Sequence, residues 1–460
     1  MTPDGAILVF DLGTTNFKAT LFGFDGTLRA LARTPTPFRH ARAPHSEVPV
    51  DAFDAALLGL ARDLRRQAPD AWAAVRAVTW SSQTNTFALL DAENAPLTPL
   101  VVWNDRRAAD HTAPVEQLQA LPRFYETTGV PGMSAEFMAA KLRWFQDQTP
   151  ELWERAARIA LISDYFTWRF TGEFITEAGA AGLTGLFDIH TLAWWKPALD
   201  IVAIDADMLP RIARTGDRIG AITPEAAAAF DLPHDCVFVT GCLDQYAGAI
   251  GAGNVATGGF SETTGTVLAT VRCADDFTPA PGSGIFWGPA ADAGRYYQML
   301  FGDVSGNLLE AFRNALPDRP DFDALTEAAA GAADSRLALP HGLDTPALLA
   351  CVRGWADSES RGDAVRAILQ GVAEALAAQL DALCGANRPA ELHSVGGAAR
   401  SRVWMQIKAI TLGIPVRAVA CPEPTSLGAA LLAMRGIDGT PLDELAARCV
   451  ALESPVQPGG

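Results

Sequence analysis

The feature that most constrains the fold is a run of apolar strands close to the N-terminus. Residues Ile7–Phe10 predict a buried strand, and Phe17–Phe24 predict a second one. Asp25-Gly26 then predicts a tight turn into a third strand, because an Asp-Gly pair between two strand-like runs is a strong hairpin signal. The chain therefore opens with three consecutive strands.

The turn between the first two strands carries more chemistry than a hairpin needs. Gly13 lets the backbone approach a ligand closely, so that successive N–H groups can face an anion. Thr14 and Thr15 add hydroxyl donors, and Lys18 adds a positive charge. Asp11 offers the hard oxygen ligand that suits hydrated Mg²⁺. The turn favours a metal-bound polyphosphate, and an ordinary Thr-rich hairpin is the alternative that this stretch leaves open.

Length and composition restrict the class of protein. A chain of 460 residues exceeds a single core, so two domains, or three, are expected. Hydrophobic residues make up 49% and charged residues 19%, as in a well-buried globular protein. The net charge of −17 argues against a nucleic-acid surface, which needs clustered Lys and Arg. The longest uncharged run, Gln245–Ser261, is rich in Gly and polar residues, which predicts no membrane span.

The cysteines and the N-terminus indicate a compartment. The seven cysteines are scattered, odd in number and without a C-x-x-C pair, so we expect buried thiols in a reducing environment. Residues Met1–Asp4 do not resemble the positively charged start of a signal peptide. The sequence therefore predicts a soluble, cytoplasmic protein.

Two polar clusters follow predicted strands in the first half. Ala74–Trp80 predicts a short buried strand that ends in the polar run Ser81–Thr86. Leu100–Trp103 predicts another strand, which delivers Asn104–Arg107. Ligands in α/β sheets usually bind at the carboxyl ends of strands. A substrate site is one interpretation of the second cluster, and a charged loop with one buried Trp is the other.

The second half carries two further clusters. Asp244 comes just after a predicted buried strand, Cys236–Thr240, and before a small-residue helix, where it could reach a cleft or serve as a helix N-cap. Phe260–Val271 predicts two strands joined by a turn at Thr264–Thr266, which echoes the Gly/Thr turn at Gly13. The echo suggests two domains, each opening with a hairpin whose turn faces a shared cleft.

Helices alternate with these strands. Val50–Gln67 repeats apolar residues at helical spacing and is expected to pack on the opening sheet, and Asp363–Leu383 predicts a long amphipathic helix. Gly396-Gly397-Ala398 forms a turn between a strand and a helix capped by Ser401. Such a turn lets a flat ring lie against the backbone, or is simply a tight βα loop. Thr425 is expected to cap the final helix, and the tail after Val450 has no predicted structure.

Taken together, these residues resemble the FGGY carbohydrate kinases from about Ile7 to Arg435. Asp11-x-Gly13-Thr14-x-x-x-Lys18 resembles the family's first phosphate turn, and Thr264-Gly265-Thr266 its second. The remaining resemblances are Gln83, Trp103-x-Asp105-x-Arg107, Asp164-Tyr165 through Thr171-Gly172, Gly241-x-x-Asp244 with Gly251 and Gly253, Gly396-Gly397-Ala398-x-x-Ser401-x-x-Trp404-x-Gln406, and Leu427-Gly428-Ala429-Ala430. Each motif is weak alone, whereas their common order is specific.

The resemblance implies an α/β fold of two ribonuclease H-like, or actin-like ATPase, domains with a cleft between them. The N-terminal domain would cover residues 1–245, with the sugar site and the first phosphate turn. The C-terminal domain would cover 246–450, with the adenosine site and the second phosphate turn. The implied activity is phosphoryl transfer from Mg²⁺-ATP, held between the domains, to a sugar hydroxyl.

The resemblance also implies roles for individual residues. Asp244 would be the base that accepts the hydroxyl proton, and a carboxylate of ordinary pKa is expected to suffice because proton transfer comes late in a loose transition state. Asp11 would hold Mg²⁺ through water. ATP would contact Gly13, Thr14, Thr15, Lys18, Gly265, Thr266, Gly306, Glu310, Gly397 and Ser401. The sugar site would contain Gln83, Thr84, Asn85, Trp103, Asp105 and Gln245.

Departures from the family pattern bear on the substrate. Many relatives carry Met-His-Gly after the Gln, and glycerol kinases carry Arg-Glu, where this chain has Thr84-Asn85-Thr86. The uncharged Thr/Asn pair favours a ketose or polyol over glycerol or a sugar acid. Ala398 replaces a frequent third Gly and narrows the adenine slot slightly.

Two other classes of protein remain alternatives. A non-catalytic sugar sensor of the same fold would be expected to lose Asp11 or Asp244, and both are present. A chaperone-type ATPase would lack Gln83 and Trp103 and would need a peptide-binding domain, for which no residues remain. Neither the particular sugar nor the oligomeric state follows from the sequence; a homodimer is one option.

Overall fold

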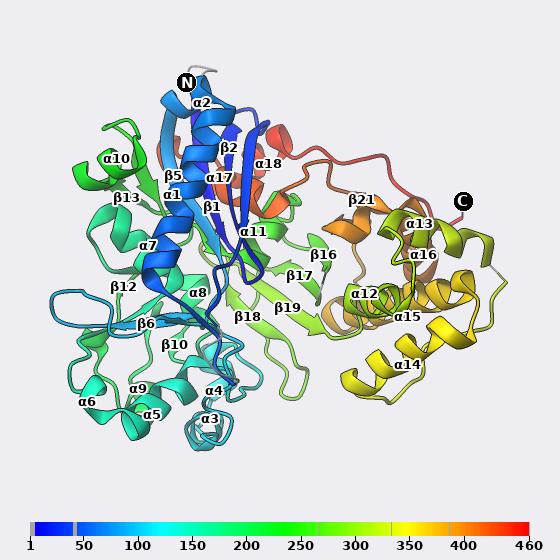
Figure 1. Cartoon of the computed structure of the whole chain (residues 1–460), viewed down its shortest axis with the longest axis horizontal. Coiled ribbons are helices and arrows are strands. Elements are labelled where there is room, and N and C mark those ends of the chain that lie inside the picture. The colour runs from blue at the N-terminus through cyan, green and yellow to red at the C-terminus, as the bar shows by residue number, and fades with distance from the viewer. Residues whose placement is uncertain (1–4, 40–43, 266, 333, 386, 460) are drawn as a thin grey trace. The chain divides into compact units, whose positions relative to one another are not determined.

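The computed structural model describes residues 5–39, 44–265, 267–332, 334–385 and 387–459 (Figure 1). The chain groups into two compact units, and each unit draws on three separate stretches. The first unit comprises Met1–Gly251, Ala274–Tyr297 and Thr425–Cys449. The second unit comprises Ala252–Cys273, Gln298–Pro424 and Val450–Gly460.

The main sheet of the first unit has the strand order β13-β14-β5-β1-β2-β3, with β15 paired to β5. The predicted opening hairpins are confirmed, because β1 pairs antiparallel with β2, and β2 with β3. All seven residues of β1 are buried, as its apolar sequence requires. The strands are β1 (Ala6–Leu12), β2 (Asn16–Gly23), β3 (Leu28–Pro35), β5 (Val75–Ser82), β13 (Arg218–Ala221), β14 (Val237–Val239) and β15 (Cys242–Leu243).

Two amphipathic helices cover this sheet. Helix α1 (Val50–Gln67) packs on β2 and β3 (Figure 1), and the predicted apolar stripe that includes Phe53 and Leu57 is buried. Helix α7 (Ile162–Thr171) brings Phe166 to 5.2 Å from Phe10, measured between ring centroids. The aromatic residues of these segments therefore form the core of the unit.

The loops predicted to bind substrate flank strands of a smaller sheet, whose order is β4-β7-β6-β8. Its strands are β4 (Glu47–Val48), β6 (Phe87–Leu90), β7 (Leu100–Val101) and β8 (Arg158–Leu161), and short pairs form between β9 (Ile175–Glu177) and β12 (Arg211–Ala213) and between β10 (Phe187–Asp188) and β11 (Ala193–Trp194). The unit also contains α2 (Pro69–Ala73), α3 (Ala113–Gln119), α4 (Phe124–Thr128), α5 (Met138–Gln148), α6 (Pro150–Trp153), α8 (Ala178–Gly182), α9 (Lys196–Val202), η1 (Ala206–Met208), α10 (Pro224–Phe230), α11 (Asp244–Gly251) and β18 (Phe286–Pro289).

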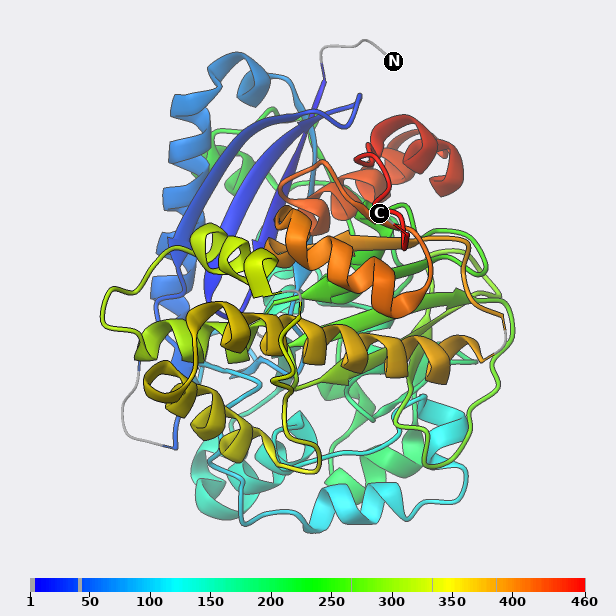
Figure 2. The ribbon, with the colours of Figure 1, turned by 90° about the vertical axis from the view of Figure 1, so that its right-hand side faces the viewer.

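The second unit pairs a sheet with a layer of helices. Its strands follow the order β17-β16-β20-β21, with β16 (Phe260–Thr264), β17 (Leu268–Ala274), β20 (Leu392–Val395) and β21 (Val416–Ala418); β19 (Tyr296–Gly302) carries the chain from one unit into the other. The long helix α15 (Arg361–Cys384) contacts α12, α13, α14 and α16 (Figure 2). The other helices are α12 (Gly306–Ala315), α13 (Phe322–Ala328), η2 (Ala329–Ala332), α14 (Thr345–Ser358), η3 (Gly397–Arg400) and α16 (Arg402–Leu412).

Helix α15 is also the one helix of the described chain that is long and apolar enough to cross a membrane. Of its most apolar window, 56% is buried inside the structure. Ile368, Val372 and Leu376 on its inner face are fully buried. These are the properties of a core helix, in agreement with the predicted amphipathic pattern.

The C-terminal region differs from the sequence-based expectation in two respects. Thr425 does not cap a final helix, because α17 (Pro424–Asp438) already includes it and α18 (Leu442–Cys449) follows. The tail after Val450 is not without structure, since Val456 bridges Val416 of β21. Pro424 explains the first error, because proline is well suited to the opening turn of a helix.

Candidate active site

Three parallel strand ends assemble the candidate site in the first unit. Strand β5 lies between β1 and β15, and Ser81 of β5 is in register with both Asp11 and Cys242. Asp244 follows β15 directly, as the first residue of α11. Two carboxylates that are 233 residues apart in sequence therefore share one edge of the sheet, the edge at which α/β proteins bind ligands.

Asp11 is held in place by two donors. Its Oδ1 accepts a hydrogen bond of 2.8 Å from the Ser81 hydroxyl, and its Oδ2 lies 3.5 Å from Nζ of Lys18. The residue is 7% exposed. In the described part of the chain, no group of three or more His, Cys, Asp or Glu side chains could hold a metal ion. A single coordinating carboxylate suits Mg²⁺, which keeps several waters and binds substrate phosphates.

Asp244 has an environment that raises its pKa. Burial, and after it the negative charge of Asp11, raises the pKa of Asp244 to about 7. Its Oδ1 accepts a hydrogen bond of 2.8 Å from the backbone N–H of Gln245. The pKa of Asp244 therefore lies above the ordinary carboxylate value that was expected to suffice for the base. A lone acid beside a strand gives no hint of the neighbouring carboxylate that the fold supplies.

The turn predicted to bind phosphate and the loops predicted to bind substrate are joined by hydrogen bonds. The Trp103 indole N–H donates to the Thr14 hydroxyl at 2.8 Å, and that hydroxyl lies 3.3 Å from Oε1 of Gln83, to which it donates. The Gln83 amide donates back to the carbonyl of Gly13 at 3.2 Å. The structure thus brings together four residues that the sequence predicted for two separate tasks. Thr15, by contrast, is exposed at the tip of the turn.

Buried charged side chains hold the Trp103 segment in place. The buried Lys141 ammonium donates to the carbonyls of Val102, at 2.9 Å, and Trp103, at 2.5 Å, and burial lowers the pKa of Lys141 to about 7. Asp105 is fully buried in an ion pair of 2.8 Å with Arg107. Burial would raise the pKa of Asp105, but hydrogen bonds from Arg107 hold it below its ordinary value. The sequence missed Lys141, because a lone Lys within an apolar helical pattern carries no site signal.

The side chains after Gln83 are partly engaged by the protein itself. Thr84 donates to the carbonyl of Ala180 at 2.8 Å. The Asn85 amide donates to the carbonyl of Leu183 at 2.9 Å, and its oxygen accepts from the N–H of Met138 at 3.1 Å. Asn85 also has a positive φ of 58°, which Asn tolerates better than most residues. Gln245 is partly exposed beside Asp244.

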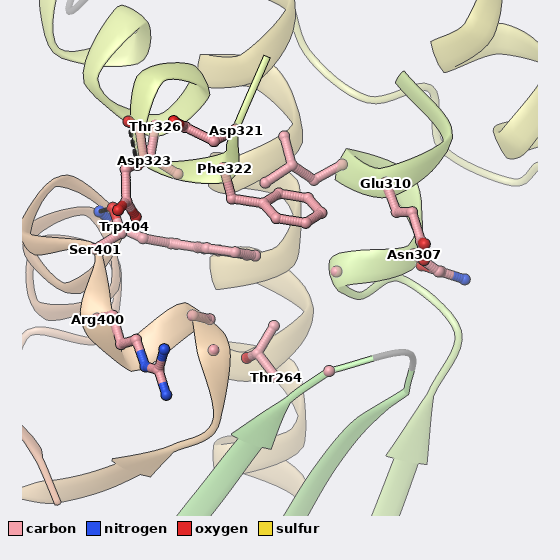
Figure 3. Close-up of a pocket in the computed structure, with 15 residues that line it drawn as sticks. Thr264, Asn307, Glu310, Asp321, Phe322, Asp323, Thr326, Arg400, Ser401 and Trp404 are labelled. Carbon is pink, nitrogen blue, oxygen red and sulfur yellow. Dashed lines mark hydrogen bonds between the residues drawn. The ribbon is translucent and has the colours of Figure 1, made fainter. Parts of the chain in front are cut away.

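The second unit contains a pocket of about 470 Å³ (Figure 3). It gathers residues from the turn after β16, the start of α12, the start of α13 and the η3–α16 segment. The lining residues are Thr264, Gly265, Gly306, Asn307, Leu309, Glu310, Asp321, Phe322, Asp323, Thr326, Gly397, Ala398, Arg400, Ser401 and Trp404. Five predicted nucleotide residues, Gly265, Gly306, Glu310, Gly397 and Ser401, therefore lie together, whereas Thr266 lies outside the described residues.

The shape and chemistry of this pocket suit a nucleoside. The rings of Phe322 and Trp404 project into it (Figure 3), and such surfaces accept a flat base. Gly396 has a φ of 88°, so the turn needs the glycine that the sequence supplies, and Ser401 caps α16 as predicted by accepting from the N–H of Trp404. Within the described chain, Asn307 Oδ1 is buried without a hydrogen-bond partner, which leaves a polar atom for a ligand or water.

The contribution of α13 to the pocket was not predicted from the sequence. Asp321 caps this helix by accepting from the N–H of Ala324 at 2.7 Å, and Phe322 is 45% exposed. An Asp before an apolar run is a recognisable start of a helix. That signal could have located the helix, but nothing in the sequence indicates that it borders the nucleotide segments.

These two units define the class of protein. The fold is the two-domain α/β fold of the actin-like ATPases, as shown by the structures of a ligand-bound xylulose kinase from Lactobacillus acidophilus (TM-score 0.86, 22% identity, 99% of this chain and 94% of that chain) and of a Plasmodium falciparum glycerol kinase with ADP (TM-score 0.83, 20% identity, 98% and 93%). At these identities the likeness establishes the fold.

The sequence matches establish the family. Residues 6–251 match the N-terminal domain of the FGGY family of carbohydrate kinases, and residues 227–437 match its C-terminal domain. A glycerol kinase from Bordetella parapertussis is 30% identical over 94% of this chain and 89% of its own length. An L-fuculokinase from Escherichia coli K12 is 28% identical over 94% and 92%. The chain belongs to the FGGY family of carbohydrate kinases, as its motifs predicted, and it is a carbohydrate kinase of a family that uses ATP.

Proposed function

We propose that this kinase phosphorylates an uncharged ketose or polyol and that Asp244 accepts the proton of the attacking hydroxyl. The observation that carries the proposal is the position of Asp244 at the sheet edge it shares with Asp11, with a pKa raised to about 7 by burial and by that neighbour. A base of this pKa is half ionised near neutral pH, where proton transfer is most effective. It would have to lie within about 3 Å of the hydroxyl.

The nucleotide site is proposed in two parts. Adenosine would bind in the pocket of the second unit, next to Gly397 and Ser401, and Gly306 and Glu310 would lie beside the nucleotide. The phosphates would contact Gly13, Thr14, Thr15, Lys18, Gly265 and Thr266, and Asp11 would hold Mg²⁺ through water. When bound, Mg²⁺-ATP supplies the transferable phosphoryl group. The task of the protein is then positioning and charge stabilisation, because the transition state is loose.

The sugar site is proposed to contain Gln83, Thr84, Asn85, Trp103 and Gln245, with Asp105 behind Trp103. The relatives named above act, by their names, on glycerol and L-fuculose. Membership of the family therefore does not identify the substrate of this chain. Thr84 and Asn85 are uncharged, which favours neutral hydroxyls over a carboxylate. We propose a substrate of about five or six carbons, because a site built to hydrogen-bond several hydroxyls rejects shorter analogues that leave its polar groups unpaired.

The functional division and the compartment are also proposals. We infer that residues 1–245 contribute the sugar site and the first phosphate turn, and that residues 246–450 contribute the adenosine site and the second turn. All seven cysteines are free thiols, which supports the cytoplasm as the working compartment. A homodimer remains the proposed assembly to test.

A substrate screen tests the proposal. ATP consumption would be measured with purified enzyme and Mg²⁺ over pentuloses, hexuloses, aldoses, polyols, glycerol and a uronic acid. The Asp244→Asn enzyme, measured in parallel, shows how much turnover belongs to this active site. We expect the highest kcat/KM for a neutral ketose or polyol. A clear preference for glycerol or the uronic acid would contradict the proposed substrate class.

A further inference from the structure

An ion pair lies in the interior of the second unit, behind the nucleotide pocket. Nζ of Lys408, on α16, is 2.6 Å from Oε1 of Glu262, on β16, and both side chains are 0% exposed. A buried ion pair contributes little net stability, because desolvation of two charges offsets their attraction, and apolar residues of similar volume often serve as well. Its presence therefore calls for an explanation other than stability.

The pair is part of a closed hydrogen-bond network. Lys408 also donates to the hydroxyl of Thr264 at 3.1 Å, and that hydroxyl donates to Oε2 of Glu262 at 2.7 Å. The hydroxyl of Ser394, in β20, donates to Glu262, and its Oγ accepts from Nζ of Lys408 at 3.4 Å. The network joins β16, β20 and α16 at one point. Fully satisfied buried networks of this kind fix geometry.

The joined elements are those that build the pocket. Thr264 and Gly265 form the turn at one side of it, and Ser401 and Trp404 come from the segment that begins α16 (Figure 3). Nζ of Lys408 lies 5.3 Å from the centre of a Trp404 ring. The Thr264–Gly265 turn is also bonded to the start of α12. The hydroxyl of Ser305, just before that helix, donates to the carbonyl of Gly265 at 2.8 Å.

We propose that Lys408 and Glu262 are positioning residues for the nucleotide. They hold the Thr264–Gly265 turn at a fixed distance from the α16 segment, so that the phosphate and adenosine contacts of one nucleotide are made together. The Thr264 hydroxyl gives its hydrogen to Glu262, which leaves the backbone of the turn to meet an anion. The pair is neutral overall and adds no net charge to the pocket. This inference rests on the proposed nucleotide site.

Separating positioning from stability needs a double variant. Lys408→Met leaves the buried Glu262 carboxylate without its cationic partner and should lower the thermal midpoint of unfolding by about 10 °C. Lys408→Met/Glu262→Met replaces the pair by apolar residues of similar volume and should regain most of that loss. Arg361→Met, which breaks the exposed ion pair of 2.9 Å with Asp318 in the same unit, is the matched control. Binding of a non-hydrolysable ATP analogue would be measured by calorimetry, together with KM for ATP and for the sugar.

The expected result is a double variant of near wild-type midpoint whose KM and Kd for the nucleotide are raised about tenfold, with the sugar KM changed less than twofold. A stable double variant with wild-type nucleotide affinity would overturn the inference. If the double variant does not fold, Thr264→Val, which leaves the pair and removes its link to the turn, must raise the nucleotide KM, or the inference is wrong. Failure of the wild-type enzyme to bind the analogue would instead refute the proposed nucleotide site.

Discussion

The indole N–H of Trp103 donates a hydrogen bond of 2.8 Å to the hydroxyl of Thr14, 89 positions earlier in the chain. Trp103 belongs to a predicted sugar loop and Thr14 to the predicted phosphate turn. Nζ of Lys141 donates a hydrogen bond of 2.5 Å to the backbone carbonyl of Trp103. The Trp103–Thr14 hydrogen bond therefore links the proposed sugar loop to the proposed phosphate turn within the first unit.

Trp103→Phe tests that connection. Phe keeps an aromatic ring but lacks the indole N–H and the five-membered ring. We expect kcat/KM to fall by about fivefold through loss of the hydrogen bond, since an ordinary hydrogen bond contributes about 1 kcal/mol. Trp72→Phe is the matched control, because the Trp72 indole donates at 2.8 Å to the carbonyl of Asp231, a residue outside the proposed site. Both variants should lose similar thermal stability, and only Trp103→Phe should lose activity. Equal kinetics in the two variants would contradict the role of the bond.

Asp244→Asn tests the base. Asn cannot accept the hydroxyl proton, so kcat should fall on the order of 10²-fold or more while KM for ATP changes little. Steady-state kinetics on the best substrate measure both constants. Asp207→Asn, at an exposed position of η1, should behave as wild type. An Asp244→Asn enzyme that keeps most of its turnover would remove Asp244 from the mechanism.

The raised pKa of Asp244 predicts a pH dependence. The base must be ionised, so kcat/KM for the sugar should be level above about pH 7 and fall below it, approaching tenfold per pH unit. Removing a neighbouring negative charge lowers the pKa of a carboxyl group. The Asp11→Asn profile should therefore begin its fall at a lower pH than the wild-type profile. If the fall in kcat/KM at acidic pH begins at the same pH in Asp11→Asn as in the wild type, a group other than Asp244 titrates.

Asn85→Ala tests the substrate loop. The change removes two hydrogen bonds, to Leu183 and Met138, and puts Ala at a positive φ. We expect kcat/KM for the sugar to fall by a factor that corresponds to about 1–3 kcal/mol of lost transition-state stabilisation. The thermal midpoint should be lower and the affinity for ATP unchanged. Asn85→Gly, which tolerates that φ, should recover part of the stability but not the sugar KM. Wild-type sugar kinetics in both variants would exclude Asn85 from the site.

Asp11→Asn tests the metal role. The loss of the carboxylate should raise the Mg²⁺ concentration required for half-maximal activity by about tenfold, because Mg²⁺ prefers anionic oxygen ligands. The measurement is a Mg²⁺ titration at fixed ATP. Ser81→Ala is the comparison, since it removes only the hydrogen bond of 2.8 Å to Asp11 and should shift the requirement much less. An unchanged requirement in Asp11→Asn would place the metal elsewhere.

The sequence alone determined those features that depend on neighbours along the chain. Continuous apolar runs and the Asp25-Gly26 turn specified the opening strands, and helical spacing specified α1 and α15. Ser401 was identified as a cap because a cap bonds the backbone only a few residues away. The common order of the motifs along the chain was sufficient to identify the family.

Tertiary structure decided what depends on partners far along the chain. Burial, together with Asp11 across two strand pairings, raises the pKa of Asp244. The pocket of the second unit gains Phe322 because α13 packs against α15 and α16. Lys408 finds Glu262 146 positions away. A local pattern fixes which face of an element is buried, but it does not fix which charge or ring the fold places opposite. The electrostatic energy of two charged groups depends on the distance between them and on the exclusion of water around them. Both are defined only once the chain has folded.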